Sequence, residues 1–171
     1  MNFFELFNLE AGYDLDVKLL AERYRQLQRA FHPDKYASGS ESERLLAVKK
    51  SAQINDAFST LKSPVARAEY LLNLVGIDLA HETKTLQDPE FLMQQMEYRE
   101  HLEDVQAMSD PFPAIVDFEK TLAQEQATLQ QSISQQLADA AYDDAANSVR
   151  KLKFIIKLNH ELERLEDQVT N

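Results

Sequence analysis

A proline fixes the end of one long helix in this chain and the start of a short connector. Upstream of Pro33, apolar side chains recur at the spacing of one helix face, at Leu20, Tyr24, Leu27 and Phe31. The same spacing returns downstream, at Ala47, Ser51, Ile54, Phe58 and Leu61. Because proline lacks an amide hydrogen and disfavours the helical conformation of the residue before it, the first helix must end near Phe31. The sequence therefore predicts a helical hairpin connected by residues 32–39.

The connector carries two side chains suited to binding, His32 and Asp34. An imidazole can donate, accept or stack, and a carboxylate suits bidentate pairing with arginine. We expect His32, Pro33 and Asp34 to form a stiff, exposed tip that docks onto a partner. Two other interpretations remain open: Asp34 is an ordinary turn residue beside a His32 that favours the helix dipole, or the two form a catalytic pair. Catalysis lacks support, because no Ser or Thr is marked as a nucleophile by its surroundings.

Composition indicates an all-α protein without a metal or redox centre. Of 171 residues, 44% are hydrophobic, but only 3 are glycine and 5 proline, too few for a β-protein with many turns. There is no cysteine, and the four histidines lack the spacing of a helical metal site. We expect no catalytic residue, no metal ion and no cofactor.

The sequence also argues against a membrane protein. No apolar run approaches the roughly 18 residues that a membrane span needs. Residues 1–7 are acidic and apolar, without the basic start of a signal peptide or the Arg/Ser-rich pattern of a transit peptide. We expect a cytoplasmic protein that has no membrane contact.

The net charge of −11 lies entirely in the second half of the chain. Residues 1–75 hold ten basic and ten acidic side chains, so the remaining 96 residues hold 18 − 10 = 8 basic and 29 − 10 = 19 acidic ones. This asymmetry favours two domains. It also argues against nucleic acid as a partner of the second one.

Cap signals divide the first half into four helices. Residues 3–7 form a short apolar cluster, Asp16 is suited to an N-cap, and Ser40 begins an S-x-x-E capping box. Ser63 and Pro64 fit the N-cap and first position of a helix that Gly76 ends. We expect one small all-α domain over residues 1–75. Residues 76–87 show no clear period and are predicted to be a linker.

The second half predicts an antiparallel three-helix bundle over residues 88–171. The first helix begins at Asp88-Pro89, the second after the turn at Asp110-Pro111, and the last near Asp143. The expected core stripe of the last helix is Ala145, Val149, Leu152 and Ile156, then Leu158, Leu162 and Leu165.

The first bundle helix has more apolar side chains than its core requires. With Phe91 at zero and 100° per residue, Tyr98, Leu102 and Val105 fall within about 40° of it and form the core stripe. Leu92, Met96 and Met93 fall at about 100°, 140° and 200°. Together with the neighbouring Glu97 and Glu100, they predict an apolar, acid-rimmed protein-binding patch. The alternative is that Leu92 and Met96 only widen the buried face, or pack on the first domain.

The helix before the tip has a basic side. Lys18, Arg25 and Arg29 share one face, and Arg23 lies a little round the helix. Such a face is often only solvated surface. Here it leads directly to His32 and Asp34, which favours one shared docking surface.

Several motifs together resemble known families. The helix ending in Phe31-His32-Pro33-Asp34-Lys35, followed by Ile54-Asn55-x-Ala57-Phe58, resembles a J-domain. The run from Ser63-Pro64 to Leu71-Leu72, with Phe91-Leu92-Met93 and Val149-Arg150-Lys151-Leu152, resembles the HscB family, the J-type co-chaperones of bacterial iron–sulfur cluster assembly. The resemblance covers nearly the whole chain. One departure is Phe31, where many J-domains have tyrosine.

The resemblance implies an L-shaped, all-α adaptor, a monomer on its own, with a J-domain and a C-terminal scaffold-binding bundle. It implies that the protein stimulates the ATPase of a specialised, HscA-like Hsp70 and delivers an IscU-like iron–sulfur scaffold protein to it. The implied Hsp70-binding residues are His32, Pro33, Asp34, Arg23, Arg25 and Arg29. The implied scaffold-binding residues are Leu92, Met93, Met96, Glu97, Glu100 and Phe154.

Two other functions remain open at this stage. A J-protein adaptor for a different client would keep the first domain but not the patch assignment. A hydrolase that uses His32 and Asp34 would turn over substrate without any Hsp70. An ATPase assay distinguishes a co-chaperone from an enzyme, because only the co-chaperone requires the Hsp70.

Overall fold

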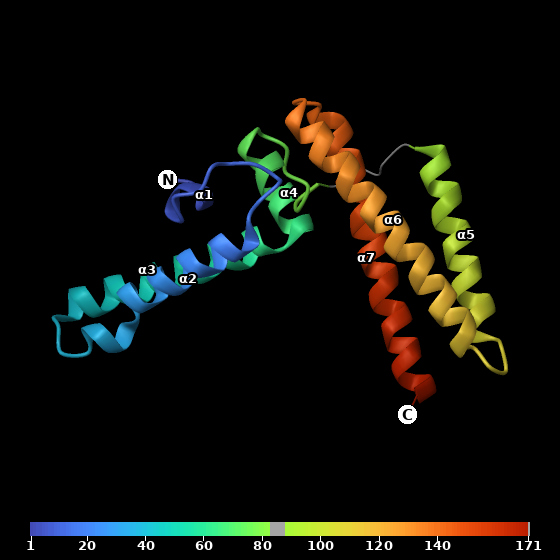
Figure 1. The fold of residues 1–171 in the computed structure, drawn as a ribbon, viewed down its shortest axis with the longest axis horizontal. Coiled ribbons are helices and arrows are strands. Elements are labelled where there is room, and N and C mark those ends of the chain that lie inside the picture. The colour runs from blue at the N-terminus through green and yellow to red at the C-terminus, as the bar shows by residue number, and fades with distance from the viewer. Residues whose placement is uncertain (83–87, 171) are drawn as a thin grey trace. The chain divides into compact units, whose positions relative to one another are not determined.

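A computed structural model describes residues 1–82 and 88–170, and every regular element among them is a helix (Figure 1). The predicted all-α class is confirmed. The chain divides into two compact units, Met1–Val75 and Gly76–Asn171. No helix in the described part combines the length and apolar character needed to cross a membrane.

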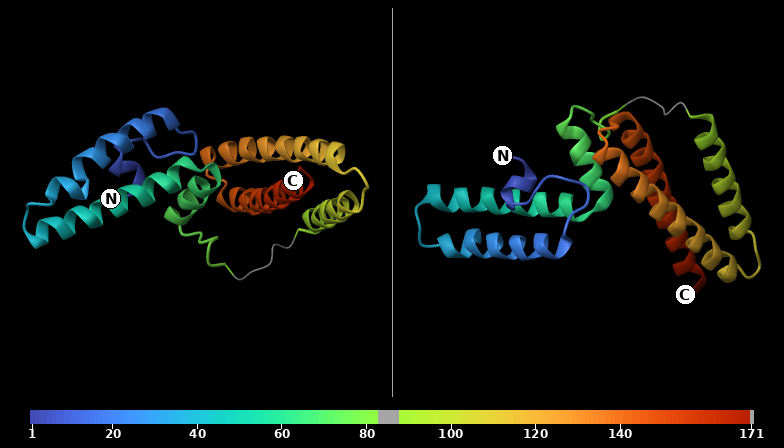
Figure 2. Two further views of the ribbon diagram at one scale, coloured as in Figure 1. Left: turned by 90° about the horizontal axis from the view of Figure 1, so that it is seen from below. Right: turned by 45° about the horizontal axis from the view of Figure 1, so that its top comes forward.

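The first unit is built around a helical hairpin. Its elements are α1 (Phe3–Leu6), α2 (Val17–Phe31), the 3₁₀-helix η1 (Pro33–Tyr36), α3 (Glu41–Lys62) and α4 (Pro64–Leu74). Helices α2 and α3 lie side by side in all views, with η1 at the turn between them (Figures 1 and 2). The predicted hairpin is therefore confirmed.

The predicted caps fix the ends of these helices. Asp16 accepts hydrogen bonds from the amides of Lys18 and Leu19, both at 3.1 Å, and Ser40 accepts one from Glu43 at 3.2 Å. Ser63 caps α4 in the same way, with Pro64 at the first helical position, where its missing donor costs nothing. Gly76, with φ at +92°, follows the end of α4 in a conformation that favours glycine.

The core of the first unit joins α1 to the hairpin. It centres on fully buried side chains, which are Phe4, Phe7, Leu20, Ile54, Ala57 and Leu61. Tyr24 on α2 stacks on Phe58 of α3 with ring centroids 4.0 Å apart, and its hydroxyl donates to Asn55 at 2.8 Å. These contacts fix the register of the two hairpin helices, and so the position of the tip.

One buried arginine closes the end of α3. Arg67, which is 6% exposed, donates from Nη1 to the carbonyl of Leu61 at 2.7 Å. Its guanidinium lies 5.1 Å from the ring centroid of Tyr13. The last carbonyls of a helix lack partners within it, so this contact replaces the missing hydrogen bond. Burial lowers the pKa of Arg67 from its ordinary value and raises that of Tyr13.

The second unit contains three long helices. They are α5 (Pro89–Gln106), α6 (Phe112–Ala138) and α7 (Tyr142–Thr170). Helices α6 and α7 lie side by side over their length (Figure 2). Side chains of α5, among them Phe91 and Arg99, pack on α7. Asp88 and Pro89 begin α5 as expected. Two predicted core positions, Tyr98 and Ile156, are only half-buried, whereas Ile155 is buried.

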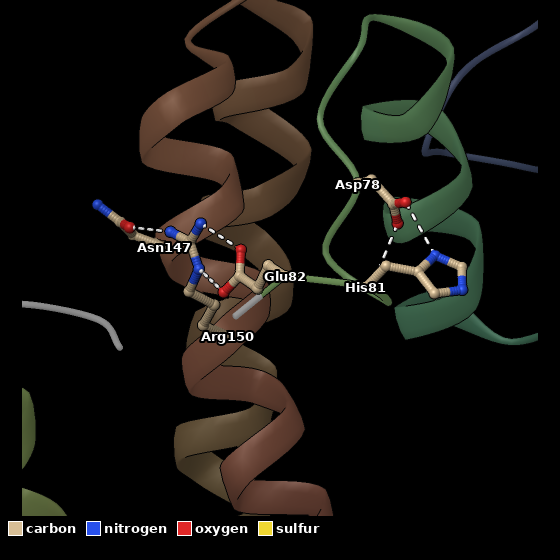
Figure 3. Close-up of polar contacts among 5 residues, drawn as sticks. All are labelled: Asp78, His81, Glu82, Asn147 and Arg150. Carbon is tan, nitrogen blue, oxygen red and sulfur yellow. Dashed lines mark hydrogen bonds and ion pairs between the residues drawn. The ribbon is translucent and has the colours of Figure 1, made fainter. Parts of the chain in front are cut away.

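The described part of the predicted linker, residues 76–82, belongs to the second unit and is joined to α7 by an ion pair. Leu79 is only 6% exposed, and the carboxylate of Glu82 accepts two hydrogen bonds from Arg150 of α7, at 2.7 and 2.8 Å (Figure 3). This ion pair raises the pKa of Arg150. Asp78 accepts from the backbone and ring of His81 within the same segment. Residues 83–87 of the predicted linker lie outside the described residues.

Candidate functional site

The tip is a polar turn held by its own side chains. His32 has extended backbone (φ −62°, ψ 132°), so α2 ends at Phe31 as predicted, and Pro33 begins η1. The Nδ1 atom of His32 accepts a hydrogen bond from the amide of Asp34 at 3.2 Å. The His32 side chain is 50% exposed and the Asp34 side chain 93% exposed. The expected exposed tip is confirmed.

This geometry assigns complementary roles to the two side chains. Because Nδ1 accepts an amide hydrogen, the proton of the neutral imidazole is placed on Nε2. Nε2 meets no hydrogen-bond partner among the described residues and is available as a donor. The Asp34 carboxylate is an acceptor that suits an arginine of a partner. The tip therefore presents a donor and an anionic acceptor two residues apart on a stiff turn.

The three arginines of α2 have different surroundings. Arg25 and Arg29 are exposed, one turn apart, and Arg29 lies in the last turn before the tip. Arg23 is half-buried and donates from Nη1 to the carbonyls of Phe7 and Asn8, at 3.0 and 3.2 Å. Arg23 thus ties the end of α1 to α2. Arg25 and Arg29 keep their charges available to a partner.

The apolar patch of α5 is exposed. The exposed fractions of Leu92, Met93 and Met96 are 57%, 63% and 65%. On the opposite side of the helix, Phe91, Leu102 and Val105 are buried in the second unit. The alternative in which Leu92 and Met96 widen the buried face is therefore wrong. Glu97 and Glu100 are exposed beside the patch.

Phe154 lies in the packing between α5 and α7. Its ring is half-buried and meets Phe91 edge to face, with centroids 5.8 Å apart. It also stacks with Tyr98 at 6.5 Å, and the guanidinium of Arg99 lies 5.6 Å from its centroid. Through these contacts Phe154 helps to hold α5 in place on α7.

The chain is similar to known proteins over nearly its whole length. Residues 87–163 match a family model described as the HSCB C-terminal oligomerisation domain. The chain is 52% identical to a co-chaperone protein HscB homolog of Shewanella baltica over 170 residues, 98% of each sequence.

The chain belongs to the HscB family of co-chaperones.

Solved structures agree with this assignment. Chaperone HscB from Vibrio cholerae superposes with a TM-score of 0.88 at 49% identity, covering 99% of both chains. The human co-chaperone protein HscB superposes with a TM-score of 0.90 at 28% identity, covering 97% of this chain and 82% of that one. The resemblance to the HscB family seen in the sequence is thus confirmed.

Sequence reasoning missed Arg99, which helps to hold α5 on α7 in this HscB family member. Arg99 lies over Phe154 and forms an ion pair with Glu161 of α7. No local pattern marks this pairing, since the two residues are 62 positions apart. Among the described residues, no group of three or more His, Asp or Glu side chains is placed to hold a metal ion.

Proposed function

We propose that this HscB family member stimulates the ATPase of a specialised, HscA-like Hsp70 and delivers an IscU-like iron–sulfur scaffold protein to it. Two exposed surfaces, one in each unit, carry the proposal: the tip at His32-Pro33-Asp34 and the α5 patch of Leu92, Met93 and Met96. An adaptor needs two separate docking surfaces. The co-chaperone names of its relatives support a chaperone as one partner.

The tip and the basic side of α2 suit the Hsp70. Docking changes the ATPase rate only if the tip binds some Hsp70 conformations more tightly than others. His32, Pro33 and Asp34 supply the short-range contacts, and Arg25 and Arg29 supply positive charge beside them. Arg23 contributes by holding α1 against α2, since its guanidinium is already bonded to backbone carbonyls.

The α5 patch suits the scaffold protein. Flexible Met and Leu side chains adapt to an apolar partner surface, and exposed carboxylates at the rim favour a basic one. Leu92, Met93 and Met96 supply the apolar contacts, with Glu97 and Glu100 at the rim. Phe154 supports the patch through its contacts with Phe91 and Tyr98.

The test is a single-turnover ATPase assay with an HscA-like Hsp70. We expect the chain to accelerate hydrolysis, to do so more strongly when an IscU-like scaffold is present, and to hydrolyse no ATP by itself. Hydrolysis by this chain alone would make it an enzyme. Acceleration that a scaffold protein never increases would favour an adaptor for another client.

A further inference from the structure

An open surface cavity on the second unit adjoins the exposed patch. It has a volume of about 350 Å³ and is lined by Glu90, Phe91, Met93, Gln94, Glu97 and Lys151. Met93 belongs to both the patch and the cavity, so a partner that covers the patch also covers the cavity mouth. Volumes of this size lie at the small end of ligand-binding pockets. The cavity therefore suits one side chain of a docked protein.

The walls of the cavity are apolar below and acidic at the rim. Phe91 is 6% exposed and provides an aromatic floor, with the flexible Met93 beside it. Glu90 and Glu97 are exposed and lie two turns apart on α5, roughly 10 Å along the helix axis. Neither carboxylate forms an ion pair within the described part of the chain.

Among the described residues that line the cavity, the one cation is already engaged. The Nζ atom of Lys151 lies 3.3 Å from Oδ2 of Asp88 and 5.9 Å from the ring centroid of Phe91. Asp88 in turn caps α5 by accepting a hydrogen bond from the amide of Phe91 at 3.1 Å. Since Lys151 is balanced by Asp88, the charges of Glu90 and Glu97 leave the cavity with a negative rim.

We propose that this cavity receives a lysine or arginine side chain of the docked scaffold protein, an inference that rests on the proposed scaffold-binding function. The aliphatic stem of such a side chain packs on Phe91 and Met93, and its charged head lies between Glu90 and Glu97.

Other occupants fit the cavity less well. An apolar side chain would desolvate Glu90 and Glu97 without giving either a partner. An acidic side chain would be repelled by both carboxylates. A basic side chain can pack its aliphatic stem on the apolar floor and also place its charge beside the carboxylates of the rim.

The experiment measures the affinity of an IscU-like scaffold protein for Glu90→Gln by titration calorimetry at low ionic strength. We expect Glu90→Gln to weaken binding roughly two- to fivefold, the range of a partly exposed ion pair, and to leave Hsp70 stimulation without scaffold unchanged. Asp104→Asn is the matched control, because it removes the same charge from the same helix about 20 Å further along the axis.

A double-mutant cycle identifies the occupant. Each surface Lys and Arg of the scaffold is replaced by Ala in turn, and its effect is measured against wild type and Glu90→Gln. Non-additive losses for one basic residue support the proposal. Equal affinities of Glu90→Gln and wild type, equal losses in Glu90→Gln and Asp104→Asn, or additive losses throughout would overturn it. A wild-type chain that binds no scaffold would instead refute the proposed function.

Discussion

At the scale of single residues, His32 is the side chain on which the docking proposal depends most. Its ring is half exposed and fills no core space, and its Nδ1 hydrogen bond to the Asp34 amide is local. Substitution there removes a docking group without opening a cavity. Its effect on function can therefore be separated from its effect on folding.

We predict that His32→Gln abolishes stimulation of the Hsp70 ATPase while it leaves helicity, melting temperature and scaffold affinity nearly unchanged. Single-turnover ATPase assays, circular dichroism and titration calorimetry on the same preparation measure all of these. Full stimulation by the variant, or its failure to fold, would contradict a docking role for the ring.

A second prediction concerns Glu119 on α6, which lies beside Glu166 and Glu163 of α7. A hydrogen bond with Glu166, then burial, and then repulsion from both acids raise the pKa of Glu119 from 4.5 to about 7. The folded state therefore holds this proton between these pH values, whereas the unfolded state releases it. The stabilisation is complete below pH 4.5 and is lost as the pH rises through about 7.

Glu119→Gln should remove this dependence. We expect the variant to be more stable than wild type at pH 8, by no more than about 1 kcal/mol because solvent screens the partly exposed group. The difference should disappear near pH 4.5. Urea denaturation across this range measures it, with Asp117→Asn as a control at an exposed acid of the same helix. A difference in unfolding free energy that stays constant from pH 4.5 to pH 8 would contradict the raised pKa of Glu119.

At the scale of helices, the local signals in the sequence predicted most of the elements. Pro33, Ser63-Pro64 and Asp88-Pro89 fix helix ends through backbone chemistry that does not depend on distant contacts. One misplaced position is Ile156, in the second half of the 29-residue helix α7. Over that length the apolar stripe drifts, so the choice between Ile155 and Ile156 depends on packing against the neighbouring helices.

Contacts between distant residues could not be predicted from the sequence. Arg23 looked like part of a basic face, but its guanidinium bonds to the carbonyls of Phe7 and Asn8. The pairing of Glu82 with Arg150 joins positions 68 apart. Such contacts depend on where the chain returns in space. For the same reason, the sequence did not indicate the cavity between Glu90 and Lys151.

The basic side of α2 supports a prediction about the Hsp70. Reversing the charges of Arg25 and Arg29 to Glu should weaken Hsp70 association, and added salt should weaken wild-type binding. Attraction between exposed charges is screened over about 10 Å at 0.1 M salt. Binding titrations over a salt series measure both effects, with reversal of Lys62 on α3 as the control. A Hsp70 affinity that responds to neither change would show that this face is only solvated surface.

Because the side chains of the α5 patch are exposed, substituting them should change the affinity for the scaffold without a large change in folding stability. Replacing Leu92, Met93 and Met96 together by Ala should weaken scaffold binding strongly and spare stimulation of the Hsp70 without scaffold. Replacing a buried Leu or Met by Ala lowers the free energy of unfolding by about 2–5 kcal/mol. These three side chains are more than half exposed, so we expect a much smaller loss of stability. Calorimetry with the scaffold and a thermal melt measure the two effects. A stable variant with wild-type affinity would refute the patch.

At the scale of the whole molecule, the two proposed docking surfaces lie on separate compact units, Met1–Val75 and Gly76–Asn171. If the two surfaces acted independently, a chain with only one of them would still either stimulate the Hsp70 or bind the scaffold. The proposed delivery requires both surfaces in one chain, because a bound scaffold would then reach the Hsp70 at the high effective concentration of a tethered partner.

This reasoning predicts the outcome of mixing two defective proteins. His32→Gln keeps the α5 patch but loses the proposed docking side chain of the tip. The variant with Ala at positions 92, 93 and 96 keeps the tip but loses the apolar side chains of the patch. We expect the mixture to stimulate the Hsp70 ATPase only as much as the triple variant does alone. Adding scaffold should not increase this rate further, as it does with wild type, because no single chain in the mixture binds both partners. Single-turnover ATPase assays measure this, and light scattering shows whether the variants remain single chains. A mixture of monomeric variants that matches wild type would show that the two surfaces need no covalent connection.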